Sequence, residues 1–330
     1  MMRKGLILAF AGMILPLVAG GVRGDSVPKS FAVEGNRYVA FSDFASFYGM
    51  QVSGPVGGRF LIENPRLRVV ANMDSRDCSI QDQQIWLHEP VRQVRGRWAF
   101  HEIDMRTSLD PILRPEVYLR EVGHRVVVID PGHGGADSGA RGRLGVEEKR
   151  VVLDVARRLR THLTSAGLTV YMTRESDRFV ELEERARMAR RWNADLFVSI
   201  HVNSAANPSA NGAETFVLTA PGFASTATGS RAGGMAPGHA HSAQSAILGY
   251  HVQRSLVAQT GVGNRGLRRG RFAVLREASS PAILVECGFV SNPQEEQRFM
   301  DPAFREDVAR GIARGILTYV QLARQAKGGG

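Results

Sequence analysis

The sequence predicts an α/β protein with a mostly parallel, twisted sheet flanked by helices on both faces, preceded by a smaller β-rich α+β domain. Three observations support this fold class. Between residues 124 and 326, apolar runs of strand length alternate with helix-length segments whose apolar residues recur every three or four positions. Residues 27–120 instead contain short β-rich runs separated by turn residues. The length of 330 residues suits one large domain or two moderate ones.

Residues 1–24 have the layout of a secretory signal peptide. A short basic start over residues 1–4 precedes an apolar segment over residues 5–18, and small residues follow. The alternative is a membrane anchor, but the apolar run is shorter than the ~20 residues that a spanning helix needs. We therefore predict export to the periplasm or cell envelope, with no stable membrane span.

Composition narrows the partners and the functional classes. Hydrophobic residues make up 43% and charged residues 22%, which excludes a mostly disordered chain and a polytopic membrane protein. The 42 Lys and Arg exceed the 32 Asp and Glu, and the net charge of +10 favours an anionic neighbour. Because an exported protein rarely meets chromosomal DNA, we expect an envelope polymer and no nucleic acid. Cys78 and Cys287 can form at most one disulfide, which export would permit.

Residues 25–120 form the predicted accessory domain. We expect strands over residues 37–41, 59–62 and 67–70, and a short helix over residues 44–48 that is capped by Ser42 or Asp43. The order of glycine, basic residue and aromatic residue at positions 35–38 recurs at 96–98, which suggests an internal duplication. The segment resembles copper amine oxidase N-terminal-like domains. It carries no cluster of metal ligands, and we predict no copper there.

Residues 121–326 form the predicted catalytic domain. Residues 125–130 are a nearly continuous apolar run, as expected for a strand that is covered on both faces. Residues 220–241 are rich in Gly, Ala and Ser and predict a flexible surface loop. The other predicted elements are strands over 168–173, 195–201, 214–218 and 282–287, and helices over 147–165, 182–192, 242–260 and 302–324.

Two histidines follow or end two of these predicted strands. His133 lies in a glycine-rich turn after residues 125–130, and His201 ends the strand over residues 195–201. In an open parallel sheet, ligands bind at the carboxyl ends of the strands, so both imidazoles are expected in one crevice. A dinucleotide-binding loop is excluded because its spacing would need a glycine near Asp137 and a helix directly after the turn.

Carboxylates could complete a metal site beside these histidines. Two histidines and one glutamate make an open zinc site in zinc hydrolases. Glu147 and Glu148 open the helix after the His133 turn, and either is a candidate ligand. The alternative is a favourable interaction with the helix dipole.

Glu286 stands near the end of an apolar strand. A charged carboxylate there is costly unless it is paired or functional. Beside a metal it could act as the general base and acid for a bound water. The alternative is a structural ion pair with an arginine such as Arg174 or Arg276.

These residues belong to a longer series of motifs, which comprises residues 130–135, 148–149, 173–177, 182–185, 194–201, 264–267 and 285–292. Through them, residues 126–322 resemble the zinc-dependent N-acetylmuramoyl-L-alanine amidases of the Amidase_3 type. The resemblance implies that one Zn²⁺ is bound by His133, Glu148 and His201. Glu148 is preferred over Glu147 because the ligand of the family directly precedes the lysine. The resemblance also implies that Glu286 is the catalytic carboxylate.

The resemblance further implies the reaction. The amide bond between N-acetylmuramic acid and L-alanine in peptidoglycan would be hydrolysed, with zinc-bound water attacking and Glu286 as general base and acid. The candidates for framing the site or for binding stem-peptide carboxylates, with structural pairing as the alternative, are Arg174, Asn203, Arg265 and Arg276.

Two other functions stay open: a zinc peptidase or carboxypeptidase acting on stem peptides, and a non-catalytic cell-wall-binding protein. The first is disfavoured because the motif of His133 and Glu148 lacks the usual His-x-x-Glu spacing.

Regulation can differ within this family. Some relatives carry an inserted helix that plugs the site until an activator binds. Residues 220–241 are too short and glycine-rich for such a helix, so we expect no built-in autoinhibition. A protein activator stays among the candidate partners. His239 and His241 of this loop are expected to face solvent.

Overall fold

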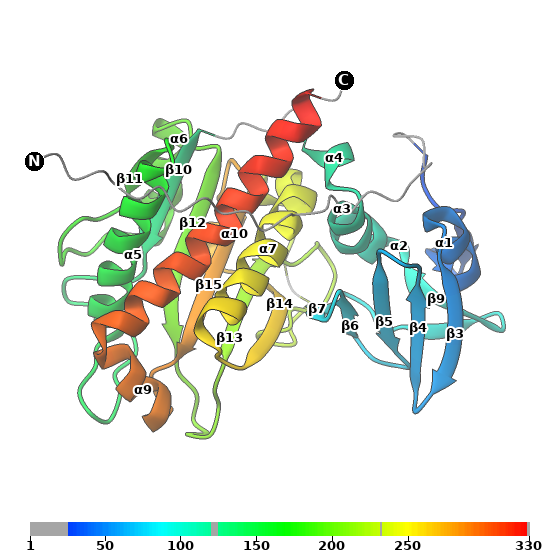
Figure 1. Ribbon diagram of the computed structural model, residues 1–330, viewed down its shortest axis with the longest axis horizontal. Helices are drawn as coiled ribbons and strands as arrows, with labels where there is room; N and C mark the ends of the chain where they lie inside the picture. The colour runs from blue at the N-terminus through cyan, green and yellow to red at the C-terminus, as the bar shows by residue number, and fades with distance from the viewer. Residues whose placement is uncertain (1–25, 120–124, 232, 329–330) are drawn as a thin grey trace, which may run out of the picture.

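The computed structural model describes residues 26–119, 125–231 and 233–328 (Figure 1). The predicted signal peptide, residues 1–24, lies outside the described residues, as do residues 120–124, where the predicted domain boundary falls. Within the described part of the chain, no helix is long and apolar enough to cross a membrane.

The C-terminal part is built on six strands. Their bounds are Val126–Pro131 (β10), Thr169–Met172 (β11), Leu196–Asn203 (β12), Ala213–Leu218 (β13), Asn264–Gly270 (β14) and Ala282–Phe289 (β15). They lie in the order β11, β10, β12, β15, β13, β14. The first four are mutually parallel, and β13 and β14 run parallel to each other but antiparallel to β15. The predicted α/β class with a mostly parallel sheet is thereby confirmed.

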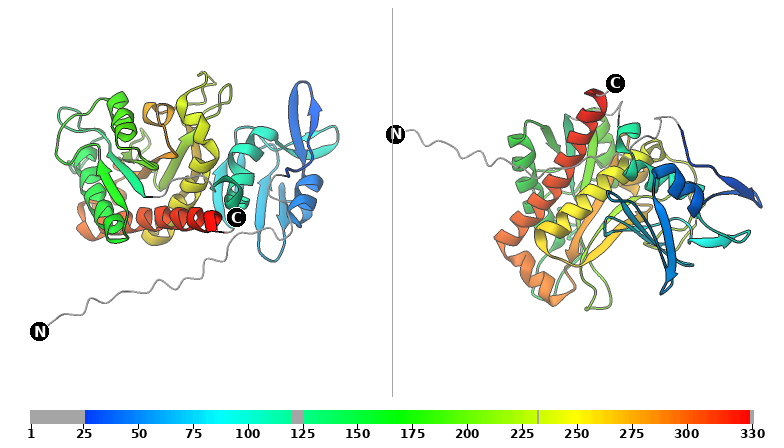
Figure 2. Two further views of the ribbon diagram at one scale, coloured as in Figure 1. Left: turned by 90° about the horizontal axis from the view of Figure 1, so that it is seen from above. Right: turned by 45° about the vertical axis from the view of Figure 1, so that its right-hand side comes forward.

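Helices cover the two faces of this sheet unequally (Figures 1 and 2). One face is covered by α5 (Glu148–Ser165), α7 (Ser242–Thr260) and α10 (Pro302–Gly328), which follows α9 (Pro293–Met300). The other face carries only the shorter α6 (Leu182–Arg191) and α8 (Ala273–Arg276).

Side-chain alternation along the central strands sorts residues between these two faces. One set is apolar throughout and packs into the core under α5, α7 and α10; it comprises Val127, Ile129, Val198, Ile200, Ile283 and Val285. The other set begins apolar under α6 and α8, with Val128, Phe197 and Leu284. It becomes polar toward the carboxyl ends of the strands, where it comprises Asp130, Ser199, His201 and Glu286. The thinly covered face therefore holds the polar residues.

The N-terminal part is β-rich, as predicted. Its strands are Phe31–Val33 (β1), Asn36–Ala40 (β2), Gln51–Val56 (β3), Arg59–Glu63 (β4), Arg68–Asn72 (β5), Asp77–Ile80 (β6), Gln83–Trp86 (β7), Arg92–Val94 (β8) and Arg97–His101 (β9). Its helical segments are Phe41–Tyr48 (α1), Glu102–Asp104 (α2), Met105–Leu109 (η1), Asp110–Leu113 (α3) and Pro115–Tyr118 (α4). In both suggested repeats a strand leads directly into a helix, and the two strands, β2 and β9, pair with each other. This arrangement is consistent with the suggested duplication.

The predicted start of the first helix is wrong. α1 begins at Phe41 and its N-cap is Ala40, which makes no side-chain cap hydrogen bond. The apolar face outweighs the capping signal here, because Phe41 and Phe44 both pack against the ring of Phe100 in the buried core.

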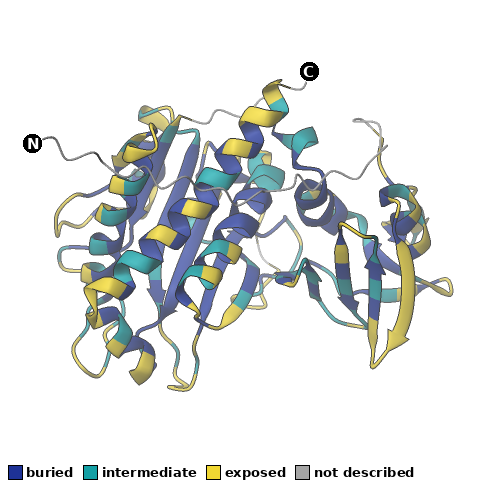
Figure 3. Ribbon diagram, in the orientation of Figure 1, coloured by how far each residue is buried: buried dark blue, intermediate teal, exposed yellow. Residues whose placement is uncertain are grey.

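The two parts of the chain share one sheet of 11 strands. β14 pairs in parallel with β7 at Leu267 and Ile85, and the strands from β7 to β3 continue the sheet into the N-terminal part. The exposure of the strands increases toward β3, whose residues are all exposed (Figure 3). Cys78 and Cys287 lie on different strands, β6 and β15, as buried free thiols.

Buried polar contacts also cross this junction. Burial lowers the pKa of His88 to about 4, so its ring is neutral. Nδ1–H of His88 then donates to Asp104 at 2.9 Å, and Nε2 accepts the N–H of Ala220 at 3.1 Å. The fully buried Arg269 of β14 donates to Ser108 Oγ and to the carbonyl of Trp86. These bonds fix the N-terminal part of the chain to β14, the strand of the C-terminal part that β7 joins.

The junction predicts a position-specific effect of an added methyl group. A Cβ atom at Gly266 (φ +88°) would lie 2.9 Å from the carbonyl oxygen of Gln84. We expect Gly266→Ala to lower the free energy of unfolding by about 1–3 kcal/mol more than Gly261→Ala. Gly261 also has positive φ (+67°), but nothing lies within 4 Å of its Cβ position. Urea unfolding followed by circular dichroism measures both variants, and equal losses would contradict the close approach.

Candidate metal centre and active site

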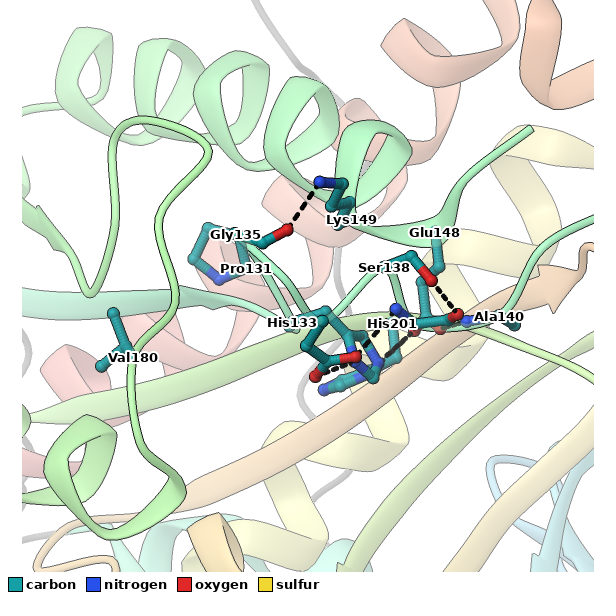
Figure 4. A network of polar contacts seen from close by, with 12 residues as sticks. Pro131, His133, Gly135, Ser138, Ala140, Glu148, Lys149, Val180 and His201 are labelled. Atoms are coloured by element: carbon teal, nitrogen blue, oxygen red, sulfur yellow. Dashed lines mark hydrogen bonds and ion pairs between the residues drawn. The ribbon is translucent and has the colours of Figure 1, made fainter. Parts of the chain in front are cut away.

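Three residues that lie far apart in the sequence meet at the carboxyl ends of β10 and β12 (Figure 4). His133 follows β10, Glu148 opens α5, and His201 lies in β12. Their candidate ligand atoms all lie within 4.8 Å of one another. Glu148 Oε1 is 3.2 Å from His133 Nε2 and 3.0 Å from His201 Nδ1. The fold thus brings together all three residues that were predicted to bind zinc.

Each side chain in this cluster is oriented by a second contact. Asp137 Oδ2 lies 2.8 Å from His133 Nδ1, so Nε2 of that ring faces Glu148. Such an outer carboxylate fixes the ring orientation and the tautomer of a metal-binding histidine. Glu148 accepts the backbone N–H groups of Ala140 and Val202. Sequence reasoning did not identify Asp137 as a site residue, although it follows His133 closely in the same turn.

The ionisation of Glu148 suits a cation at the cluster. Burial alone would raise the pKa of Glu148, but the hydrogen bonds from His133 and His201 hold it well below its ordinary value. The carboxylate is therefore ionised. Donor atoms that bind one tetrahedral Zn²⁺ at about 2.0–2.1 Å lie roughly 3.3 Å from one another. The observed separations of 3.2 and 3.0 Å are close to that value, so the donor set fits one zinc ion.

A buried ion pair between Asp130 and Arg185 supports the turn that carries His133. Asp130 is fully buried and accepts hydrogen bonds from Arg185, Thr173 and Ser199. Arg185 also donates to the carbonyl of His133. A Cβ atom at Gly132 would lie 2.2 Å from the ring of His201, so only glycine lets this turn approach the second histidine.

Arg174 lies beneath the same turn. Its side chain is fully buried, and its guanidinium donates to the carbonyls of Pro131, Gly132, Lys149 and Ser176. Burial lowers the pKa of Arg174 to about 10. The structure therefore places this candidate substrate residue behind the cluster, with its donors directed at backbone oxygens.

Glu286 lies beside the cluster, on the neighbouring strand β15. It is directly opposite His201 in the β12–β15 register and is 9% exposed. Its Oε2 atom has no hydrogen-bond partner among the described residues. Burial, reinforced by the charges of Glu148 and Glu214, raises the pKa of Glu286 well above its ordinary value.

The alternative structural ion pair for Glu286 is absent from the described residues. Arg174 is occupied by backbone carbonyls, and Arg276 lies 3.9 Å from Glu277. Asn203 and Arg265 instead bind a further buried carboxylate, Glu214, which sequence reasoning missed. Arg276 does not join this group; it lines a separate cavity with Arg271 and His239.

A cavity of about 350 Å³ opens beside His133 and His201 on the thinly covered face. Its walls are mainly apolar and include Phe179, Leu182 and Phe272. Phe179 and Leu182 are 49% and 54% exposed, so the rim of the site presents apolar surface to solvent.

The loop over residues 220–241 lies outside the metal cluster. Its described residues contain one short helical segment, η2 (Pro237–His241), and no long helix. His239 and His241 are half-buried rather than solvent-facing, and His239 Nε2 lies 3.0 Å from the carbonyl of Thr219. The flexibility of this loop stays a prediction.

These features define a protein of the α/β class whose site is suited to metal-assisted hydrolysis: two histidines and a carboxylate at strand ends, beside a buried, unpaired carboxylate. The chain belongs to the N-acetylmuramoyl-L-alanine amidase family (Amidase_3), because the family model matches residues 127–318. The family resemblance is thereby confirmed, and the N-terminal domain lies outside the matched residues.

Similar proteins agree with this assignment. The amidase AmiA of Escherichia coli K12 is 36% identical over 221 residues, which cover 60% of this chain and 76% of AmiA. The solved structure of AmiC2 from Nostoc punctiforme is 38% identical and covers 61% of this chain and 99% of its own, with a TM-score of 0.51. The catalytic domain of CwlV from Bacillus (Paenibacillus) polymyxa var. colistinus is 36% identical, covers 60% and 99%, and also has a TM-score of 0.51.

The support beneath the His133 turn predicts a large stability effect of one isosteric change. Asp130→Asn leaves Arg185 buried without its counter-charge, and we expect it to lower the free energy of unfolding by about 3–5 kcal/mol at pH 7. The matched control is Asp154→Asn, because Asp154 is 35% exposed and pairs with Arg158 and Arg305 at the surface. We expect that control to cost less than about 1 kcal/mol.

The pKa of Asp130 determines how the difference in unfolding free energy between the unaltered chain and Asp130→Asn depends on pH. Burial alone would raise this pKa, but the charge of Arg185 and the surrounding hydrogen bonds hold it below its ordinary value. The stabilisation is therefore complete above the unfolded pKa of about 3.9 and is lost as the pH falls through the folded-state value. Urea unfolding of the unaltered chain and of Asp130→Asn, at pH 7 and below pH 4, measures this stabilisation. A difference in unfolding free energy that grows on acidification would contradict the ion pair.

Proposed function

We propose that this chain is an exported, zinc-dependent amidase that hydrolyses the bond between N-acetylmuramic acid and L-alanine in peptidoglycan. One observation carries the proposal: the buried, unpaired carboxylate of Glu286 stands directly opposite His201 of the three-residue cluster. Membership of the amidase family supplies the bond and the substrate. The named relatives, including AmiA, are N-acetylmuramoyl-L-alanine amidases.

His133, Glu148 and His201 would hold the zinc ion. When bound, Zn²⁺ supplies a Lewis acid that polarises the amide carbonyl and lowers the pKa of water. Asp137 keeps His133 Nε2 directed into the site, and the backbone N–H groups of Ala140 and Val202 fix the orientation of the Glu148 carboxylate.

Glu286 would move the proton. A carboxylate whose pKa is raised binds a proton more readily, which suits a group that takes one from water and delivers it to the leaving amine. Oε2 is free of hydrogen-bond partners among the described residues, so it can face the reacting atoms. Arg174 would act as a positioning residue. Its buried guanidinium donates to the carbonyls of Pro131 and Gly132 and does not present an exposed donor group to a substrate.

Export rests on the sequence pattern of residues 1–24 and on the charge of the chain. The net charge of +10 suits an anionic wall polymer. A protein activator stays a prediction, and so does the absence of built-in autoinhibition.

Digestion of purified peptidoglycan tests the reaction and separates it from the alternatives. We expect release of intact stem peptides, seen by mass spectrometry, and loss of that release with a chelator. Glu286→Gln should slow the release by about 10²–10⁴-fold while the variant still binds zinc. Shortened stem peptides that stay attached to glycan would favour a peptidase instead. Binding without release from the zinc-loaded, unaltered chain would indicate either a site that needs a protein activator or a wall-binding protein.

Two adjacent glutamates offer a matched test of the ligand set. Glu148 is buried within the cluster, whereas Glu147 pairs with Arg150 at 2.8 Å outside it. We expect Glu148→Gln to lower the zinc affinity by at least tenfold. We expect Glu147→Gln to retain one zinc per chain, measured by competition with a chromogenic chelator. Equal zinc binding by both variants would exclude Glu148 as a ligand.

A further inference from the structure

A row of charged side chains crosses the sheet from the metal centre toward the N-terminal domain. His201 and Glu286 are opposite each other in β12 and β15, and Glu286 and Glu214 are opposite each other in β15 and β13. Directly opposite residues of neighbouring strands point to the same face of the sheet. Glu214 is 3% exposed, so its charge needs partners within the protein.

Two arginines of β14 supply those partners. Arg265 Nε and Arg268 Nη1 both donate to Glu214 Oε2, at 2.9 and 2.7 Å. Residues three apart in a regular strand face opposite sides of a sheet. The β13–β14 register shifts between Ala213 and Thr215, and this irregularity lets both arginines reach one face.

The N-terminal domain completes this arrangement through Trp86. The indole N–H of Trp86 donates to the carbonyl of Arg265 at 3.1 Å. The guanidinium carbon of Arg268 lies 5.1 Å from the centre of the Trp86 ring, in a cation–π contact. Trp86 ends β7, the strand that joins the two domains, so the domain junction positions both arginines.

Among Glu214, Arg265 and Arg268 the charges do not cancel. Two guanidinium groups share the single carboxylate of Glu214, which leaves one positive charge in excess. The side chains of Arg265 and Arg268 are 35% and 16% exposed. Arg268 Nε has no hydrogen-bond partner among the described residues. The pair is therefore preorganised, partly open to solvent and able to accept a further anion.

We propose that Arg265 and Arg268 form a subsite for a carboxylate of the stem peptide, and that Trp86 of the N-terminal domain is its positioning residue. The proposal rests on the proposed function, because that reaction brings a peptide next to Glu286. Every unmodified peptide ends in a carboxylate, and the planar guanidinium fork matches a carboxylate in shape and charge. The N-terminal domain thereby takes part in substrate recognition.

Calorimetry on the zinc-loaded, full-length Glu286→Gln chain tests the subsite without turnover. The probes are synthetic N-acetylmuramoyl-L-alanyl peptides of two and three residues, whose only carboxylate is at the C-terminus, and the same peptides ending in an amide. We expect at least one acid to bind about tenfold more tightly than its amide. Adding Arg268→Met should remove this difference.

Two further changes separate positioning from general damage. Trp86→Ala should also remove the difference between acid and amide, and Trp86→Phe, which keeps an aromatic ring under Arg268, should restore most of it. Arg106→Met is the matched control, because Arg106 is a 71% exposed arginine of the N-terminal domain that pairs with Glu102. We expect it to leave the difference unchanged.

The outcomes distinguish the subsite from the reaction. Equal affinities of every acid and its amide, or a difference that survives Arg268→Met, would overturn the subsite. If the unaltered chain cleaves the probes but shows no such difference, the reaction stands and the subsite falls. If the difference is present but the unaltered chain cleaves neither probe, the subsite stands and the proposed reaction falls.

Discussion

The buried ion pair between Asp130 and Arg185 is the interaction on which the site depends. Asp130 ends an apolar strand, and its charge is tolerable only because Arg185 and two hydroxyl groups surround it. The same arginine donates to the carbonyls of Pro131 and His133, so the neutralising group also shapes the turn. The arginine that neutralises Asp130 therefore also places the turn that carries His133.

Much of the fold and of the metal centre was predictable because its signals are local. Apolar runs mark β10, β12 and β15, and a histidine or glutamate near the end of each run stands out against it. β14 gave no such signal, because its sequence from Asn264 to Gly270 contains one apolar side chain and three arginines. Its strand conformation comes from pairing on both sides, with β13 and β7, which only the tertiary structure supplies.

The missed site residues share this cause. Glu214 begins a strand and reads as an ordinary polar residue, and Trp86 lies about 180 positions before its partners. Neither residue has a motif of its own. Their positions near the site depend on how the strands pair. Glu214 lies opposite Glu286, and β7 joins the sheet beside β14. Sequence reasoning also treated the N-terminal part as an accessory domain and did not foresee that strands of both parts share one sheet.

Three carboxylates in the site are compensated in different ways, and the difference assigns their roles. Glu148 is held ionised by two histidines, whereas Glu214 pairs with two arginines. Glu286 lies beside both of these carboxylates without such a partner, and burial together with their charges raises its pKa well above the ordinary value. A divalent cation at the histidine cluster would supply the missing positive charge. Glu286 is therefore the carboxylate that the proposed reaction would use to move a proton.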